Sequence, residues 1–178
     1  SSRSRTHAPG ASSEWINSDG LKVLFSTDRA RASRGGSYSQ LSAGRHCVEV
    51  TIALASLPTV ASGNSQIVAD NVMIPNGAFI EQIDVLVTKE TAGVNANLDL
   101  GLVDQDFSTA IDLNGFLAAA DAFNGGTDLG TLTTYIVGTT EAGALIGTKI
   151  TNTGYIVANA ETADFTAGVI KVRIFYSM

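Results

Sequence analysis

The chain has 178 residues, of which 44% are hydrophobic and 16% charged, a formal net charge of −6 and a single cysteine, Cys47. This length favours one domain, a lone cysteine excludes an intrachain disulfide, and no stretch approaches the ~18 consecutive apolar residues of a membrane span. The overall acidity argues against general nucleic-acid binding. We therefore expect no membrane partner and no specific nucleic-acid partner.

Charge is divided unevenly along the chain. Residues 1–46 hold seven Lys/Arg against three Asp/Glu, a formal +4, whereas residues 47–178 hold four against fourteen, a formal −10. A cationic, Ser/Gly-rich segment beside an acidic, apolar-rich one is typical of an arm that contacts another surface and a body that folds by itself. The sequence therefore predicts a basic arm and loop with one short strand over 1–46, and a folded body over 47–178.

The arm begins with a polar stretch, residues 1–18, in which Trp15 and Ile16 are the only large apolar side chains. A short strand is predicted over 21–25, followed by a long basic loop over 27–44. Trp15 and Ile16 suit docking on a partner, with folding back onto the body as the alternative. The arginines of the loop suit bidentate pairing with a partner's carboxylates, or else they keep a solvated loop soluble. The predicted partner-binding residues are Arg3, Arg5, Trp15, Ile16, Arg29, Arg31 and Arg34.

Cys47 lies at the start of the body, in the sequence Arg45-His-Cys-Val-Glu-Val. This string predicts a strand. Because free cysteine behaves as a small hydrophobe, we expect its side chain to be buried.

The body shows alternating polar and apolar residues, the period of half-buried strands. In 97–103, Leu98, Leu100 and Leu102 fall on one face; in 79–88, the odd positions carry most of the apolar residues. Gly, Asn and Pro separate the alternating segments. Short strands separated by turns predict an all-β, antiparallel sandwich of the jelly-roll type. The predicted strands of the body cover 48–54, 66–74, 79–88, 97–103, 132–137, 154–159 and 169–176.

One segment departs from that alternation. Phe116, Ala119, Ala120 and Phe123 are spaced i, i+3, i+4 and i+7, which predicts a short amphipathic helix over 114–123. A second short helical turn is predicted over 141–146. Either would cover one end of the sandwich.

Catalytic and metal-binding residues are sparse. The two histidines, His7 and His46, lie in the arm and at the mouth of a strand, so neither is held as a general base. Asp104, Asp106 and Asp112 supply oxygen ligands of the kind that calcium takes, but they lack the spacing of an EF-hand, and a solvated loop or an interface cation remain the alternatives. We expect no enzymatic activity, no cofactor and no resident metal.

Several strings, taken in order, resemble a family of small virion structural proteins of tailed bacteriophages. The first is Asn17-Ser-Asp-Gly-Leu-Lys-Val-Leu-Phe-Ser-Thr-Asp, and the similarity continues to the last strand. The later strings are Arg45-His-Cys-Val-Glu-Val-Thr-Ile-Ala-Leu, Ile74-Pro-Asn-Gly-Ala-Phe-Ile-Glu, Leu98-Asp-Leu-Gly-Leu-Val, Ile111-Asp-Leu-Asn-Gly-Phe-Leu-Ala-Ala, Gly143-Ala-Leu-Ile-Gly-Thr and Phe165-Thr-Ala-Gly-Val-Ile-Lys-Val-Arg-Ile.

The resemblance implies a non-enzymatic cement or decoration protein on the outside of a phage capsid, assembled in the bacterial host cytoplasm. Its implied partners are the major capsid protein and further copies of itself, with a trimer favoured, and the partner-binding residues above become capsid-binding residues. The alternative function is a receptor-binding or head-fibre module, for which aromatic loop tips would be expected.

Overall fold

The computed structural model describes residues 14–16, 22–24, 45–59, 65–68 and 72–178. The chain forms two compact units, Ser1–Arg45 and His46–Met178. In the first unit, two three-residue strands, β1 (Glu14–Ile16) and β2 (Lys22–Leu24), form a small antiparallel sheet in which Trp15 lies opposite Val23. The sequence predicts only the second of these strands.

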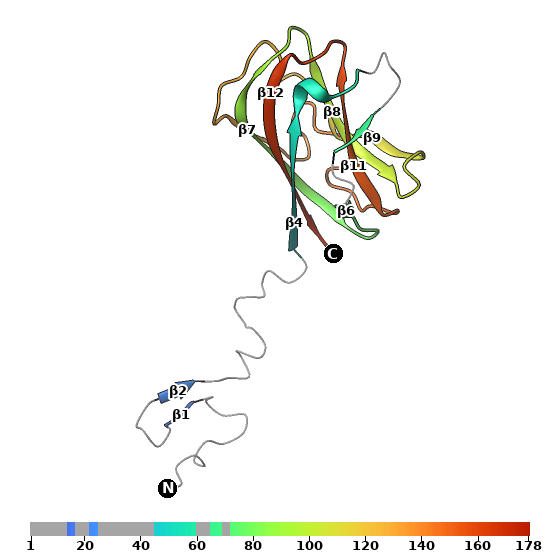
Figure 1. Cartoon of the computed structure of the whole chain (residues 1–178). Helices are drawn as coiled ribbons and strands as arrows, with labels where there is room; N and C mark the ends of the chain where they lie inside the picture. The colour runs from blue at the N-terminus through green and yellow to red at the C-terminus, as the bar shows by residue number, and fades with distance from the viewer. Residues whose placement is uncertain (1–13, 17–21, 25–44, 60–64, 69–71) are drawn as a thin grey trace. The chain divides into compact units, whose positions relative to one another are not determined.

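The second unit is an antiparallel β-sandwich of two sheets (Figure 1). One sheet has the order β10-β7-β12-β4 and the other the order β5-β11-β8-β9, with the short strand β6 also paired to β11. The strands are β4 (Arg45–Ala53), β5 (Gln66–Ile67), β6 (Met73–Ile74), β7 (Phe79–Ala92), β8 (Asn97–Asp104), β9 (Ala110–Ala120), β10 (Leu132–Tyr135), β11 (Gly154–Glu161) and β12 (Ala167–Ser177).

The order of the strands is that of a jelly roll. With the two-residue β6 set aside, the first strand lies beside the last (β4 and β12), the second beside the seventh (β5 and β11), the third beside the sixth (β7 and β10) and the fourth beside the fifth (β8 and β9). This nested pairing distributes eight strands over two facing sheets, as in double-sheet jelly rolls. The predicted fold class, an all-β sandwich, is confirmed.

The core lies between the two sheets. Leu98, Leu100 and Leu102 of β8 are completely buried, as their alternation predicts, and face Ile83 and Val85 of β7, which are also completely buried. Each fully buried aliphatic side chain of this size contributes about 1.5–3 kcal/mol relative to an exposed one. The inner faces of both sheets therefore hold the sandwich together.

A β-bulge near the start of β7 changes which of its first residues point into the core. The odd positions were expected to face inward, but Ile80 is completely buried while Phe79 is 42% exposed. Tyr176 of β12 pairs with Ile80 and Phe175 with Gln82, so that Glu81 is an extra residue on β7. This bulge turns Ile80 to the same side as Ile83, because one inserted residue reverses the alternation.

The predicted helix over 114–123 is wrong. Residues up to Ala120 belong to strand β9, and the other predicted helical turn, 141–146, runs alongside that strand. The Ala118 N–H donates to the Glu141 carbonyl at 2.9 Å, the Gly143 N–H to the Phe116 carbonyl at 3.0 Å and the Leu145 N–H to the Gly115 carbonyl at 2.8 Å. Residues 141–145 thus cover the edge of β9 with a short pairing, and residues 114–120 are part of β9 itself.

Two glycines explain why these residues pair as extended chain, although their apolar residues are spaced as in a helix. A Cβ built on Gly143 would lie 2.1 Å from the carbonyl carbon of Gly115, and one on Gly115 would lie 2.4 Å from the Leu145 side chain. Only residues without a Cβ allow this approach of two backbones. Within the described ranges the only helix is the three-residue 3₁₀ turn Leu54–Ser56, and no helix there is long and apolar enough to cross a membrane.

The remaining predicted strands correspond to observed strands with shifted ends. The strand predicted over 66–74 appears as two short strands, β5 and β6, both paired to β11. Strand β7 continues four residues beyond its predicted end at Thr88, to Ala92. The sandwich therefore contains one long strand, β9, that the sequence does not predict.

Candidate interaction surface

The predicted partner-binding residues are described only in part. Arg3, Arg5, Arg29, Arg31 and Arg34 lie outside the described residues. Trp15 and Ile16 lie in β1, of which the backbone pairing alone is described. Their capsid-binding role stays a prediction.

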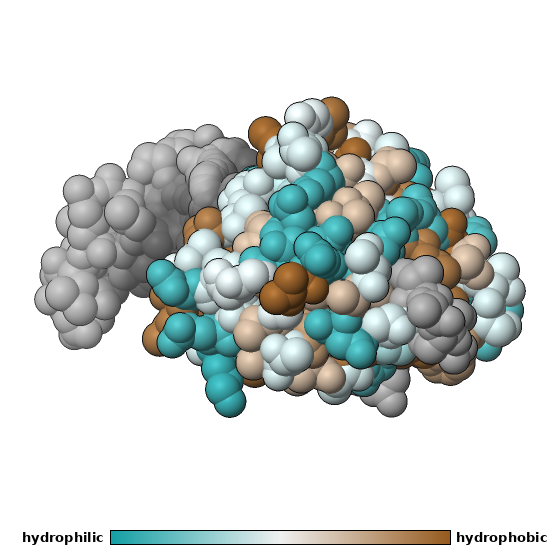
Figure 2. All heavy atoms as spheres, turned by 90° about the horizontal axis from the view of Figure 1, so that it is seen from above, coloured by the Kyte–Doolittle hydropathy of each residue, from teal (hydrophilic) through white to brown (hydrophobic). Residues whose placement is uncertain are grey.

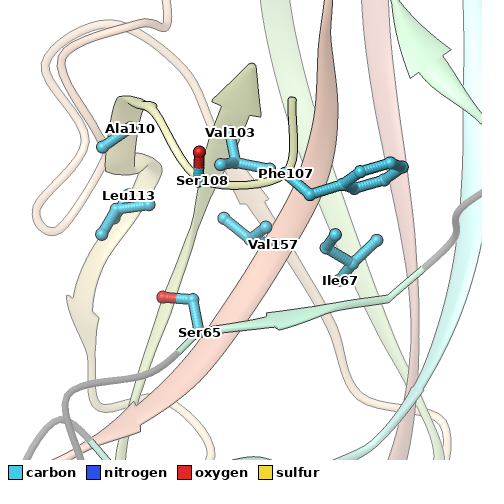
Figure 3. A pocket seen from close by; sticks show the side chains of 8 residues that line it. All are labelled: Ser65, Ile67, Val103, Phe107, Ser108, Ala110, Leu113 and Val157. Atoms are coloured by element: carbon cyan, nitrogen blue, oxygen red, sulfur yellow. The ribbon is translucent and has the colours of Figure 1, made fainter. Parts of the chain in front are cut away.

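The outer face of the β5-β11-β8-β9 sheet is hollowed beside the turn between β8 and β9. A pocket of about 360 Å³ opens there (Figure 3), and its lining residues are Ser65, Ile67, Val103, Phe107, Ser108, Ala110, Leu113 and Val157. Val103 of β8 and Val157 of β11 form its floor and are 5% and 2% exposed. Phe107 and Leu113, which line opposite sides, are 52% and 40% exposed. The pocket thus has a buried aliphatic floor and exposed apolar walls.

Phe107 sits at the turn between β8 and β9 with a φ of +61°. A bulky residue rarely adopts this left-handed backbone conformation, which costs less free energy for Gly or Asn. Its ring stacks on that of Tyr155 with centroids 4.6 Å apart and an interplanar angle of 19°. The turn therefore holds an exposed aromatic ring in a fixed position, at the expense of backbone strain.

Asp106 fixes the shape of this turn. The Thr109 hydroxyl donates to its Oδ2 at 2.5 Å, and the Ser108 and Thr109 N–H groups each donate to its Oδ1 at 2.8 Å. These hydrogen bonds, that of the Thr109 hydroxyl above all, lower the pKa of Asp106 from 3.8 to about 2. Asp106 is consequently ionised at neutral pH and keeps a negative charge beside Phe107.

Asp104, Asp106 and Asp112 were the candidate calcium ligands. Asp104 accepts the Gln105 N–H at 2.6 Å and Asp112 accepts the Asn114 N–H at 3.3 Å, so each carboxylate bonds to its own turn. Among the described residues there is no group of three or more His, Cys, Asp or Glu side chains arranged to hold a metal ion.

The strands around the pocket carry acidic residues and no basic ones. Strands β5, β6, β8, β9 and β11 hold Asp99, Asp104, Asp112 and Glu161 but no Lys or Arg. Asp99 is 7% exposed and its Oδ1 accepts the Ala119 N–H at 2.7 Å. Its charge raises the pKa of the neighbouring Glu161, with desolvation adding to the effect. The strands of this sheet therefore carry a net negative charge.

The other sheet balances its charges. On its outer face the Arg173 Nε donates to Glu49 Oε2 at 2.7 Å, and the Lys171 ammonium lies 3.9 Å from Glu49 Oε1. The hydrogen bond from Arg173 lowers the pKa of Glu49. On this face Glu49 is therefore paired with two cationic side chains.

The prediction that the Cys47 side chain is buried is wrong, because the side chain is exposed. It lies near the start of edge strand β4, where Arg45, His46 and Cys47 are all exposed and burial begins only at Val50. The ring of His46 stacks on Tyr176 at 5.1 Å. The side chain is exposed despite its apolar character, because the buried part of β4 begins only at Val50.

In the view of Figure 2, hydrophobic residues are scattered among hydrophilic ones. Isolated exposed apolar side chains are normal for soluble domains. The Phe107 pocket as a whole could not be predicted from the sequence, because its floor and walls come from four strands and a turn. The string Asp104-Gln-Asp-Phe-Ser-Thr did carry one local signal, an aromatic residue among turn-forming polar residues.

No protein-family model and no curated protein matches the chain. Among solved structures, a chain of the cyanophage Pam1 capsid asymmetric unit is similar at 14% identity and a TM-score of 0.49, over 84% of this chain and 95% of that chain. A chain of the acidic stable capsid structure of Helicobacter pylori bacteriophage KHP30 is similar at 14% identity and a TM-score of 0.42, over 75% and 87%. Similarity at this level assigns neither a family nor a function.

Proposed function

We propose that the protein is a non-enzymatic structural component of a phage virion, which binds the outside of the capsid and stabilises the lattice. The observation that carries the proposal is the separation of charge between two compact units. The chain is +4 over residues 1–46 and −10 over residues 47–178, and the unit boundary falls at Arg45/His46. One copy thus offers a basic segment and a self-sufficient acidic body, as attachment to an acidic surface requires.

The string-by-string resemblance to phage virion proteins supports the same role. It runs in order from Asn17 to Ile174, and its strings from Arg45 onward lie within or beside the strands of the jelly roll. In this proposal Arg3, Arg5, Trp15, Ile16, Arg29, Arg31 and Arg34 contact the major capsid protein, and copies associate as trimers.

Stabilisation follows from mass action. A protein that binds the assembled lattice and not its dissociated subunits stabilises the lattice by about 2.7 kcal/mol per site at a hundredfold excess over its dissociation constant. Weak contacts of single copies suffice when they are repeated across a shell.

A receptor-binding or head-fibre module is the second candidate. The observation in its favour is Phe107, an exposed aromatic residue at a turn, which such a module would use to recognise a host surface. The two candidates differ in where the protein sits and in what its removal changes.

Binding to heads that lack the protein tests the first proposal. Replacement of Arg29, Arg31 and Arg34 by Ala is expected to reduce occupancy at low salt, and high salt is expected to reduce wild-type occupancy, because exposed ion pairs are screened. Replacement of the same three by Lys keeps the charge and serves as the matched control. Unchanged occupancy of the Ala variant at both salt concentrations would contradict the proposed contacts.

A further inference from the structure

We propose that the Phe107 pocket is a docking site for a cationic, apolar peptide segment of a partner protein. The proposal concerns the body alone and does not depend on the virion role. Its first basis is the shape of the site, since Val103 and Val157 form a buried aliphatic floor between two exposed apolar walls, Phe107 and Leu113. A pocket with these walls accepts one large apolar side chain.

The second basis is the fixed position of the aromatic wall. Phe107 is held at a φ of +61°, stacked on Tyr155, in a turn shaped by the hydrogen bonds to Asp106. A ring that is rigid before binding loses little conformational entropy when a ligand packs on it. Backbone strain that presents an exposed aromatic side chain indicates a recognition role rather than a contribution to stability.

The third basis, charge complementarity, selects the occupant. Asp104 and Asp106 lie in the same turn as Phe107, Asp112 precedes Leu113, and the strands of this sheet carry no Lys or Arg. An acidic partner would be repelled, and so would a nucleic acid or an anionic lipid surface. A segment with a large apolar residue flanked by arginines would fill the pocket and bring its guanidinium groups to the carboxylates of Asp106 and Asp112, the sequence neighbours of the lining residues Phe107 and Leu113.

Fluorescence anisotropy with the full chain tests the proposal. The probe is a labelled synthetic peptide with a Trp-Leu pair flanked by arginines on both sides, and the comparison probe has glutamates in place of those arginines. We expect saturable binding of the arginine peptide, weakened by salt, and no binding of the glutamate peptide. Equal binding of the two peptides, or no binding of the arginine peptide, would overturn the proposal.

Two variants locate the binding. Phe107→Gly removes the ring and also the positive-φ penalty, so the turn keeps its conformation, and Leu113→Ser removes the opposite wall. Each is expected to weaken binding of the arginine peptide by about tenfold or more, the loss typical of a central apolar contact. Leu129→Ala, which trims an exposed apolar residue that does not line the pocket, is the matched control and keeps wild-type affinity. Wild-type affinity in both pocket variants would overturn the assignment.

Discussion

The two sheets of the sandwich are alike on their inner faces and different on their outer faces. Strands of the β10-β7-β12-β4 sheet carry equal numbers of acidic and basic residues, namely Glu49, Glu81, Asp84 and Glu90 against Arg45, Lys89, Lys171 and Arg173. Strands of the β5-β11-β8-β9 sheet carry four acidic residues and no basic one. The two sheets thus share a core, while only the strands of one carry a net negative charge. Each outer face holds a pocket, of about 360 Å³ on the β5-β11-β8-β9 sheet and about 140 Å³ beside Lys171 and Arg173 on the other.

The difference in charge between the two sheets distinguishes side chains that stabilise the fold from side chains that remain available to a partner. On the balanced face Glu49 bonds to Arg173, whereas on the acidic face Glu161 lies against another carboxylate, that of Asp99. An arrangement of like charges costs stability unless a cationic partner offsets it.

The inner faces are expected to be equivalent. Leu100→Ala in β8 and Ile83→Ala in β7 each remove a completely buried side chain, and each is expected to lower the free energy of unfolding by about 2–5 kcal/mol. Urea denaturation of the two variants measures the loss. A loss below about 1 kcal/mol for either one would show that its sheet does not share the common core.

The backbone contact at the edge of β9 is expected to have the next largest effect. In Gly143→Ala the new methyl group would meet the backbone of Gly115 and Asn114 within 2.5 Å, so we expect a loss of about 3 kcal/mol, at the upper end for overpacking. Gly138→Ala, which has φ of +90° but nothing within 4 Å of its Cβ, isolates the conformational penalty of about 1 kcal/mol. Equal urea midpoints for the two variants would contradict the close approach.

The acidic face predicts a stabilising substitution. Asp99 raises the pKa of Glu161 above its ordinary value of 4.5, so the folded state holds the proton more tightly than the unfolded state and stability falls as pH rises through this range. Glu161→Gln is therefore expected to raise the urea midpoint at pH 7, with the gain vanishing below the ordinary pKa. On the neighbouring strand β8, Asn97 lies opposite Glu161 and Asp99 lies opposite the neutral Asn159.

The exposed Glu90→Gln on the other sheet is the control for that measurement and is expected to change the midpoint little. If Glu161→Gln instead lowers the midpoint at pH 7, its charge is stabilising and the acidic face carries no excess repulsion.

The balanced face is expected to show the smallest effect. Glu49→Gln removes the partner of Arg173 and Lys171, but these side chains are 35–51% exposed, and exposed ion pairs contribute little to folding. The urea midpoint of this variant is expected to stay close to that of the wild type in low and in high salt. A loss as large as that of Gly143→Ala would show that this ion pair organises the sheet.

Much of the fold could be predicted from the sequence, because alternation in a half-buried strand reports directly on its two faces. Leu98, Leu100 and Leu102 illustrate this, since all three are buried on one face as expected. The β9 region could not be predicted, because the helical spacing of Phe116, Ala119, Ala120 and Phe123 arises by coincidence in a bulged strand and the turn after it. Its conformation depends on Gly143, a residue distant in sequence, and tertiary pairing overrides local propensity in such cases.

Less of the candidate site could be predicted. The basic arm was identified from charge alone, and its residues stay predictions. The Phe107 pocket depends on a turn, on two strands that supply its floor and on the short strand β5, which the chain brings together only on folding. The exposure of Cys47 was missed for a similar reason, since the point at which β4 leaves the core is set by the length of its neighbours.

The central claim, that the protein strengthens a capsid by binding its surface, is tested most directly by heating. Heads with and without the protein would be warmed stepwise while genome release is followed with a dye that fluoresces on DNA. We expect release at a higher temperature when the protein is bound, with assembly of the heads unaffected. Superimposable release curves, with the protein confirmed on the heads, would contradict it and favour the receptor-binding alternative.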